Sequence, residues 1–319
     1  MGLSIEGGNF MKKVLALCLV GLLVLAGCSS GKPADEKLEE KTYSIGTAIM
    51  TNYTADAGDD GSIPFESNVT YFTVALEGDK IAYLTLDAAQ NDITVKDGQA
   101  LEFKAKGTKK ELLEDYGMSK IPGGKGEWYK QVIAFQKYAI GKTVEELKTG
   151  DVASDLSSSV SINLTGFIAG VELAASKAVK VDNVARIANA STTGSQTKAG
   201  ETDLEIVTTV AAVATNKEGK VVYSFVDEAQ AKAAIVDGVP VIEESSLVTK
   251  GEKKEAYGMS ENGLVEWYKQ VETLTDWTMG KTMEEIAKGG DDADLTSKVT
   301  IYPGSFFTAL DEALAKTKL

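Results

Sequence analysis

Side chains able to do chemistry are few in this 319-residue chain. There is no histidine, and the two cysteines are Cys18 and Cys28. The absence of histidine excludes a Ser-His-Asp triad, haem ligation through histidine and the usual zinc sites, and we predict no metal site. Both cysteines lie at an apolar N-terminal run, so neither is expected to serve as a disulfide, iron–sulfur or catalytic thiol. Chemistry here therefore comes from a bound or attached group, or there is none.

A hydroxyl motif remains, and it occurs twice. Segment 155–161 reads Asp-Leu-Ser-Ser-Ser-Val-Ser, and segment 294–300 reads Asp-Leu-Thr-Ser-Lys-Val-Thr, 139 residues later. The positions of interest are the opening aspartates, the serines three residues on and the closing hydroxyls: Asp155, Asp294, Ser158, Ser297, Ser161 and Thr300. The alternative interpretation of Ser161 and Thr300 is a helix N-terminal or strand hydroxyl that forms a local hydrogen bond.

The motif is part of a longer internal repeat. Glu-Trp-Tyr-Lys-Gln-Val at 127–132 recurs at 266–271, Tyr-Gly-Met-Ser at 116–119 recurs at 257–260, and Gly-Lys-Thr at 141–143 recurs at 280–282. A repeat of about 140 residues has the size of a domain and not of a solenoid unit. We therefore predict a signal peptide over 1–28, a polar tether over 29–42, a first repeat over 43–180 and a second over 181–319.

Each repeat is expected to contain strands first and helices after them. Segments 69–76 and 204–213 are rich in β-branched and aromatic residues, and each is followed by a turn and a second strand, 81–86 or 221–226. Apolar residues at helical spacing follow each Glu-Trp-Tyr motif, and a glycine, Gly141 or Gly280, ends each helix. We therefore predict that each of the two repeats is an α+β domain. The Ser/Thr/Gly-rich segment 191–201 is expected to be a long loop or a flexible segment.

Two other motifs are better explained structurally. Gly-Lys-Thr resembles the end of a P-loop, but Gln136 or Thr275 stands where the first glycine belongs. Thr143 and Glu146, like Thr282 and Glu285, instead have the spacing of a helix capping box. Segment 56–61 resembles the start of a calcium-binding loop but lacks the glutamate at the twelfth position, so we expect an acidic turn.

The N-terminus predicts export and lipid attachment. Two lysines at 12–13 precede an apolar run over 14–26, which is shorter than the ~20 residues that a spanning helix needs. Leu-Ala-Gly-Cys at 25–28 resembles the bacterial lipobox, in which the cysteine sulfur receives a diacylglycerol and cleavage occurs just before it. Met11 is a natural start, with Met1 the alternative. We expect a protein held to the outer face of the cell membrane through Cys28, and the formal net charge of −14 argues against nucleic acid as a partner.

In its hydroxyl motif, the chain resembles the flavinylated FMN-binding domains of exported redox proteins. Their motif is Asp-x-x-Ser/Thr-Gly-Ala-Thr/Ser, and its last hydroxyl receives FMN as a phosphoester from a flavin transferase. The resemblance implies two covalent FMN groups, on Ser161 and Thr300, with Asp155, Ser158, Asp294 and Ser297 as recognition positions. This chain departs from the motif at the glycine position, where Ser159 and Lys298 stand, and at the alanine position, where Val160 and Val299 stand.

Over nearly the whole chain, the lipobox, tether and two repeats resemble the pheromone-encoding lipoproteins of Gram-positive flavin-based extracellular electron transfer. The resemblance implies an electron carrier and not an enzyme in the usual sense. It takes electrons from a membrane donor, a quinone or NADH dehydrogenase system, and delivers them to extracellular acceptors such as ferric iron. Residues 20–27 would be the released octapeptide. A flavin carries the redox function itself, which suits a chain without histidine or cysteine chemistry.

Two further points stay open on the sequence alone. Trp128 and Trp267, with neighbouring tyrosines, either line the flavin or belong to the core. The competing function is a non-redox surface lipoprotein, ligand-binding or adhesive, whose signal peptide serves as a pheromone precursor.

Overall fold

The computed structural model describes residues 39–58, 60–288, 295, 298–301 and 304–317. Its strands form two antiparallel sheets, with orders β4-β3-β2-β1-β5 and β6-β7-β8-β9. The strands of the first sheet are β1 (Lys41–Ala55), β2 (Ile63–Glu77), β3 (Lys80–Lys96), β4 (Gln99–Ala100) and β5 (Val179–Val184). Those of the second are β6 (Arg186–Ser195), β7 (Asp203–Thr215), β8 (Val221–Val236) and β9 (Val239–Ile242). The fold is α+β, as predicted.

The helices follow the strands in each repeat. The first repeat has α1 (Lys109–Leu112), the 3₁₀ turns η2 (Leu113–Tyr116) and η3 (Met118–Lys120), α2 (Trp128–Ala139), α3 (Val144–Thr149), α4 (Val152–Asp155) and α5 (Thr165–Ser176). The second has η4 (Glu244–Leu247), α6 (Lys250–Lys253), η5 (Lys254–Tyr257), η6 (Met259–Asn262), α7 (Trp267–Thr278), α8 (Met283–Lys288) and α10 (Gly304–Lys316). The order of equivalent elements is the same in both.

Local sequence explains most of these elements. The predicted hairpins form, with Gly78 and Gly219 at positive φ in their turns. The predicted helices α2 and α7 form, and Gly141 and Gly280 follow them at positive φ. The capping box at Thr143 is present as expected, and residues 56–58 and 60–61 lie between β1 and β2.

The prediction for segment 191–201 is wrong over its first half. Residues 191–195 belong to β6 and pair with β7 in continuous register, from Ser191 opposite Val210 to Ser195 opposite Ile206. The small side chains of β6 allow α10 to pack closely against this strand, with Ala190 and Ala309 both fully buried in one cluster. Composition suggested a loop, whereas packing against α10 favours a strand with small residues.

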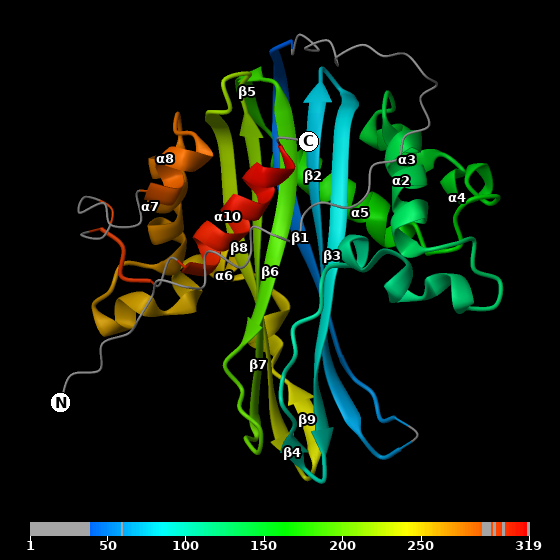
Figure 1. The fold of residues 1–319 in the computed structure, drawn as a ribbon, viewed down its shortest axis with the longest axis vertical. Coiled ribbons are helices and arrows are strands. Elements are labelled where there is room, and N and C mark those ends of the chain that lie inside the picture. The colour runs from blue at the N-terminus through cyan, green and yellow to red at the C-terminus, as the bar shows by residue number, and fades with distance from the viewer. Residues whose placement is uncertain (1–38, 59, 289–294, 296–297, 302–303, 318–319) are drawn as a thin grey trace, which may run out of the picture. The chain divides into compact units, whose positions relative to one another are not determined.

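The two sheets pack face to face, with helices on their outer faces (Figure 1). Along β2, Phe72 and Val74 point to the helices, while Val69 and Tyr71 point to the second sheet. This alternation is the two-residue period of a strand that is buried on both faces. Each repeat therefore has its own helix-facing core, and a third cluster joins both repeats. Residues 38–319 form one compact unit.

A pseudo-twofold relation connects the repeats. Strand β6 directly follows β5 in the chain but belongs to the second sheet, whereas β5 pairs antiparallel with the start of β1 in the first sheet, Lys41 opposite Val184 and Ile45 opposite Val179. The boundary proposed after residue 180 thus lies within β5. Two ion pairs cross between the repeats in equivalent positions: Lys177 to Glu252 at 3.1 Å, and Lys316 to Glu111 at 3.7 Å.

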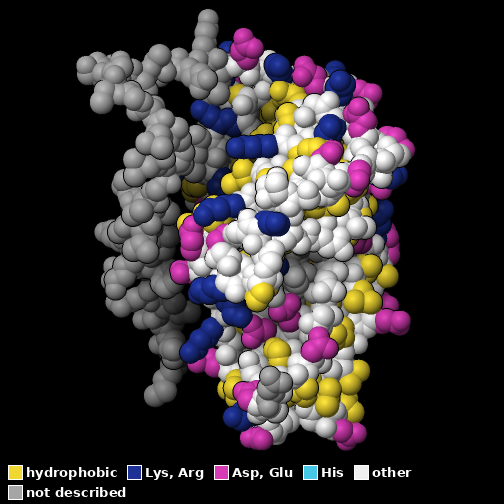
Figure 2. Space-filling view, turned by 90° about the vertical axis from the view of Figure 1, so that its right-hand side faces the viewer, with side chains coloured by type: hydrophobic (Ala, Val, Ile, Leu, Met, Phe, Trp, Pro, Cys, Tyr) yellow, Lys and Arg dark blue, Asp and Glu magenta, His cyan; other side chains and the backbone are white. Residues whose placement is uncertain are grey.

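None of the described helices is long and apolar enough to cross a membrane. The signal peptide, the lipobox with Cys28 and nearly all of the tether lie outside the described residues. Figure 2 shows the face covered by the first repeat's helices, where acidic and basic side chains are interspersed. No single sign of charge dominates this face despite the acidic composition.

Candidate functional site

Each expected acceptor hydroxyl is held by a buried glutamine. Oε1 of Gln131 accepts hydrogen bonds from the backbone N–H of Ser161 (2.7 Å), its Oγ (3.3 Å) and the N–H of Ile162 (3.1 Å). Oε1 of Gln270 accepts from the N–H of Thr300 (2.6 Å), its Oγ1 (3.3 Å) and the N–H of Ile301 (3.0 Å). Both glutamines are fully buried, whereas Ser161 and Thr300 are exposed.

The amide nitrogen of each glutamine fixes which way the side chain points. Nε2 of Gln131 donates to the carbonyl of Gly126 at 2.8 Å, and Nε2 of Gln270 donates to the carbonyl of Val265 at 2.6 Å. With both ends satisfied, the glutamine ties the segment before α2 or α7 to the acceptor segment. This glutamine clamp, defined as Gln131 or Gln270 with its partners, presents a hydroxyl to solvent on an ordered backbone.

A buried glutamate positions the start of the clamp helix. The carboxylate of Glu127, directly before α2, accepts hydrogen bonds from the side chain of Ser119 and from the N–H groups of Met118 (2.9 Å) and Ser119 (3.1 Å). Glu266 does the same for the N–H groups of Met259 (3.3 Å) and Ser260 (2.9 Å). These hydrogen bonds lower the pKa of both glutamates. The recurring Tyr-Gly-Met-Ser and Glu-Trp-Tyr motifs are thus two halves of one contact.

A buried aspartate anchors the short helix that precedes these turns. Asp227 accepts from the hydroxyl of Thr249 (2.6 Å) and from the N–H groups of Gly251 (2.8 Å) and Glu228 (2.7 Å). Asp87 holds α1 through the equivalent three bonds. Desolvation raises the pKa of both carboxyls, that of Asp227 to about 6. In each repeat, α1 or α6 is thereby fixed to the sheet.

In the second repeat these elements surround an open cavity of about 600 Å³. Its lining includes the Lys250 ammonium, the rings of Tyr257 and Trp267, and Ile301, the residue next to Thr300. Aromatic and apolar walls with a few fixed polar groups are typical of sites for small molecules and cofactors. The Lys250 ammonium in this wall is paired with the Glu228 carboxylate at 2.6 Å, so the aromatic rings are the part of the lining suited to a planar ring system.

In the first repeat, hydrogen bonds link several of the polar side chains of this region to one another. Tyr116 donates through its hydroxyl to Oε1 of Gln90 at 2.9 Å, and Nε2 of Gln90 donates to Glu66 at 2.5 Å. The Ser161 Oγ additionally accepts from the N–H of Lys125 at 3.2 Å. The two acceptor segments are thus alike in backbone, and their surroundings differ.

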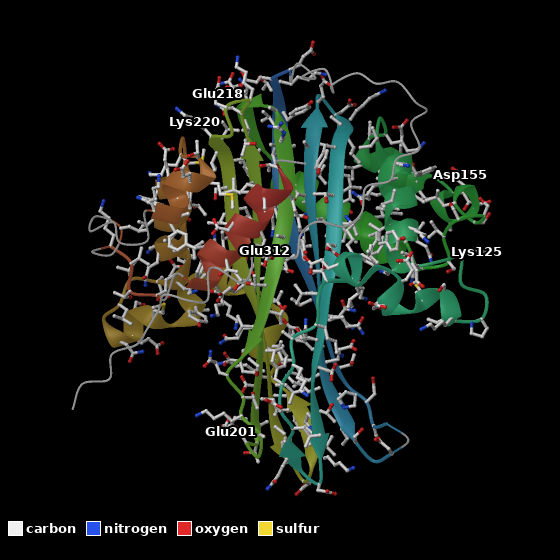
Figure 3. All side chains as sticks on the ribbon, in the orientation of Figure 1. Lys125, Asp155, Glu201, Glu218, Lys220 and Glu312 are labelled. Carbon is white, nitrogen blue, oxygen red and sulfur yellow. The ribbon has the colours of Figure 1, made fainter. Side chains whose placement is uncertain are left out.

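The motif residues before Ser161 lie together on the surface. Asp155 ends α4, and its carboxylate accepts a hydrogen bond from the hydroxyl of Tyr138 on α2. This bond raises the pKa of Tyr138 to about 12. Ser158 is exposed in the following turn. Figure 3 shows Asp155 and Lys125 at the outer side of the first repeat's helices. Asp294 and Ser297 lie outside the described residues.

Both tryptophans belong to the core, and one of them also lines a cavity. Trp128 and Trp267 are 5% and 3% exposed and belong to the helix-facing cores. Trp267 also lines the cavity, as does Tyr257. Tyr129 and Tyr268 point outward and donate to acidic side chains, Tyr129 to Glu114 and Tyr268 to Glu255.

Sequence reasoning missed the glutamines, Glu127, Glu266, Asp87 and Asp227 as site-building residues. The signal was present, because each recurs at the same place in the two repeats, but a repeated polar residue does not by itself say which contact it makes. Within the described ranges, no group of three or more Asp, Glu, His or Cys side chains is placed to hold a metal ion. The chain matches no protein-family model, no curated protein and no solved structure.

Proposed function

We propose that the chain is a membrane-anchored extracellular electron carrier with FMN attached covalently to Ser161 and Thr300. The observation that carries the proposal is the repeated glutamine clamp. In both repeats an exposed hydroxyl is held on a fixed backbone by the same buried side chain. A hydroxyl that a second enzyme must modify needs to be accessible, and Ser161 and Thr300 are both exposed while their backbone N–H groups bind the glutamine.

The attachment chemistry needs only the hydroxyl from this chain. With FAD as the donor, the transferase directs the acceptor oxygen to the phosphorus of the FMN half. A phosphoester bond forms, the bond to the AMP half breaks, and the hydroxyl proton is released. The bound flavin supplies one- and two-electron chemistry, so no histidine, cysteine or metal is required. Tethering also keeps the flavin at an effective concentration of the order of millimolar.

The two acceptors differ in how free their oxygen is. The Ser161 Oγ accepts a hydrogen bond from Lys125, which occupies a lone pair that the transfer reaction needs. Thr300 Oγ1 forms only its bond to Gln270 among the described residues. We therefore expect Thr300 to be labelled more completely than Ser161, in line with the family motif, which most often ends in threonine.

Intact mass measurement tests the proposal. Co-expressed with a flavin transferase, the mature protein should gain two FMN units and turn yellow. Ser161→Ala should remove one unit, Thr300→Ala the other, and the double variant both. Ser157→Ala is the matched control, because this exposed serine donates only to the carbonyl of Ser154 and should leave both units in place.

Three results would bear on the proposal differently. One FMN unit that is lost only with Thr300→Ala would restrict the proposal to the second repeat. An unmodified mass from a transferase-competent host would contradict it and favour the non-redox surface lipoprotein. If two units are attached, the reduced protein should pass electrons to ferric iron and the double variant should not.

A further inference from the structure

The second repeat neutralises its buried lysine with a glutamate. Nζ of Lys250 lies 2.6 Å from Oε2 of Glu228, and the two residues are 9% and 5% exposed. The other carboxylate oxygen accepts from the hydroxyls of Thr209 (2.8 Å) and Ser305 (3.3 Å). Lys250 and Glu228 both line the cavity beside Thr300. The cavity wall therefore contains a closed ion pair with no net charge.

The first repeat keeps the lysine without the glutamate. Lys109, 8% exposed, is the first residue of α1, as Lys250 is of α6. Its ammonium lies 5.1 Å from the ring centre of Tyr116 and 5.7 Å from that of Trp128, much as Lys250 lies over Tyr257 and Trp267. Ala88 follows Asp87 where Glu228 follows Asp227.

Among the described residues, no carboxylate oxygen forms an ion pair within 4 Å of the Lys109 ammonium, and the carboxylates of Glu66 and Asp87 act on it only from a greater distance. Gly166, at the position equivalent to Ser305, has also lost the hydroxyl that holds the carboxylate in the second repeat. The lysine pKa values reflect the same difference. Burial lowers the pKa of Lys109, whereas for Lys250 burial is outweighed by Glu228 and its pKa is raised.

A net charge over these tyrosine and tryptophan rings would act on a flavin bound beside them. Reduction adds electrons to the ring system, and a nearby cation stabilises the added negative charge, while a closed ion pair does so far less. In a partly buried site a unit charge a few ångströms away changes the redox equilibrium by about tenfold or more.

We propose, building on the attachment of one flavin to each repeat, that the two flavins have different reduction potentials and that the first repeat has the higher one. At equilibrium, electrons then reside preferentially on the flavin of the first repeat. When the two flavins exchange two electrons, the favoured products are the oxidised flavin at Thr300 and the reduced flavin at Ser161. The accompanying proton is released to water by the donor and taken from water by the acceptor, so no further reactant is consumed.

The test uses the full chain carrying a single flavin. Thr300→Ala leaves FMN on Ser161 only, and Ser161→Ala leaves it on Thr300 only, as intact mass verifies. Spectroelectrochemical titration of each protein at one pH gives its potential. We expect the Ser161-linked flavin to be more oxidising by at least tenfold in the redox equilibrium, which is about 30 mV for a two-electron couple.

Charge variants identify the cause. Glu228→Gln, added to Ser161→Ala, keeps the size of the glutamate and one acceptor oxygen for Thr209 and Ser305 while removing the charge that pairs with Lys250, and should raise the potential. Lys109→Met, added to Thr300→Ala, should lower the potential of the other flavin. Glu218→Gln is the control: it removes a carboxylate from the exposed turn between β7 and β8, whereas the two lysines begin α1 and α6, and it should change neither potential.

The outcomes separate the two proposals. A protein without FMN by mass refutes the proposed function itself. Flavin on both repeats with equal potentials, or with the first repeat lower, overturns this inference and leaves the proposed function standing. Charge variants that fold, as judged by circular dichroism, and leave both potentials unchanged also overturn it.

Discussion

Gln270→Leu is the most direct perturbation of the glutamine clamp. Leucine has nearly the volume of glutamine, so it fills the fully buried space without a large cavity. It removes the acceptor for the N–H groups of Thr300 and Ile301, and the donor for the carbonyl of Val265. The variant thus separates the hydrogen bonds of the clamp from its packing.

The expected cost follows from the number of groups left without partners. A buried polar group that loses its partner costs about 1–3 kcal/mol. Water can reach Thr300, which is exposed, and satisfies part of the loss there. We therefore expect Gln270→Leu to lower the free energy of unfolding by about 2–4 kcal/mol. In a protein of this size the melting temperature should fall by roughly 5–10 °C.

Urea and thermal unfolding measure this effect, and intact mass measures its consequence for attachment. Glu272→Leu is the matched control, because Glu272 is exposed on the same helix and should change stability by less than ~0.5 kcal/mol. Gln270→Leu should also abolish FMN transfer to Thr300 while Ser161 is still labelled. A stability loss no larger than that of the control, with Thr300 labelled normally, would refute the role assigned to the clamp.

Three further predictions concern other parts of the chain. A Cβ on Gly170 would lie 2.3 Å from the ring of Phe72, so Gly170→Ala should lower the free energy of unfolding by about 1–3 kcal/mol. The loss should be smaller in a Phe72→Ala background, and equal losses in the two backgrounds would exclude the clash. The pKa of Asp227 is raised to about 6, so the folded state binds a proton more tightly than the unfolded state, and the free energy of unfolding should fall as pH rises from about 4 to 6. Asp227→Asn should reduce that fall by about 1–3 kcal/mol. An unchanged pH dependence would contradict the assignment. Cys28→Ala should release the protein from the membrane fraction, because the lipid supplies nearly all of the membrane affinity; retention after a high-salt wash would show another anchor.

Elements with local signals were predictable from the sequence. The Trp128 and Trp267 helices have an apolar stripe and are followed by a glycine, and both formed as expected. The hairpins likewise depend on a glycine turn between β-rich segments. The packing of one sheet on the other was not predictable, because it depends on contacts between residues more than 100 positions apart, such as Tyr71 with Ser191.

The candidate site was predictable only in part. The acceptor positions followed from the repeated motif, and the structure places both in the same local geometry. The clamp did not follow, because a buried glutamine at helical spacing looks like any other polar residue of a helix until its partners are known. The repeats differ at Glu228 and Ala88, and this difference is visible in the sequence. Its effect on the charge of the cavity wall was not predictable, because that effect depends on Lys250 lying against the Glu228 carboxylate.

The pairing of β1 with β5 also bears on the history of the chain. A single repeat would expose the inner face of its sheet, and a second copy would cover that face through the same antiparallel contact about a twofold axis. Such an ancestor would be a homodimer, in which any substitution appears in both halves at once. Joining the halves in one gene lifts that restriction. A glutamate can then arise opposite one lysine and an alanine opposite the other, which no symmetric dimer allows.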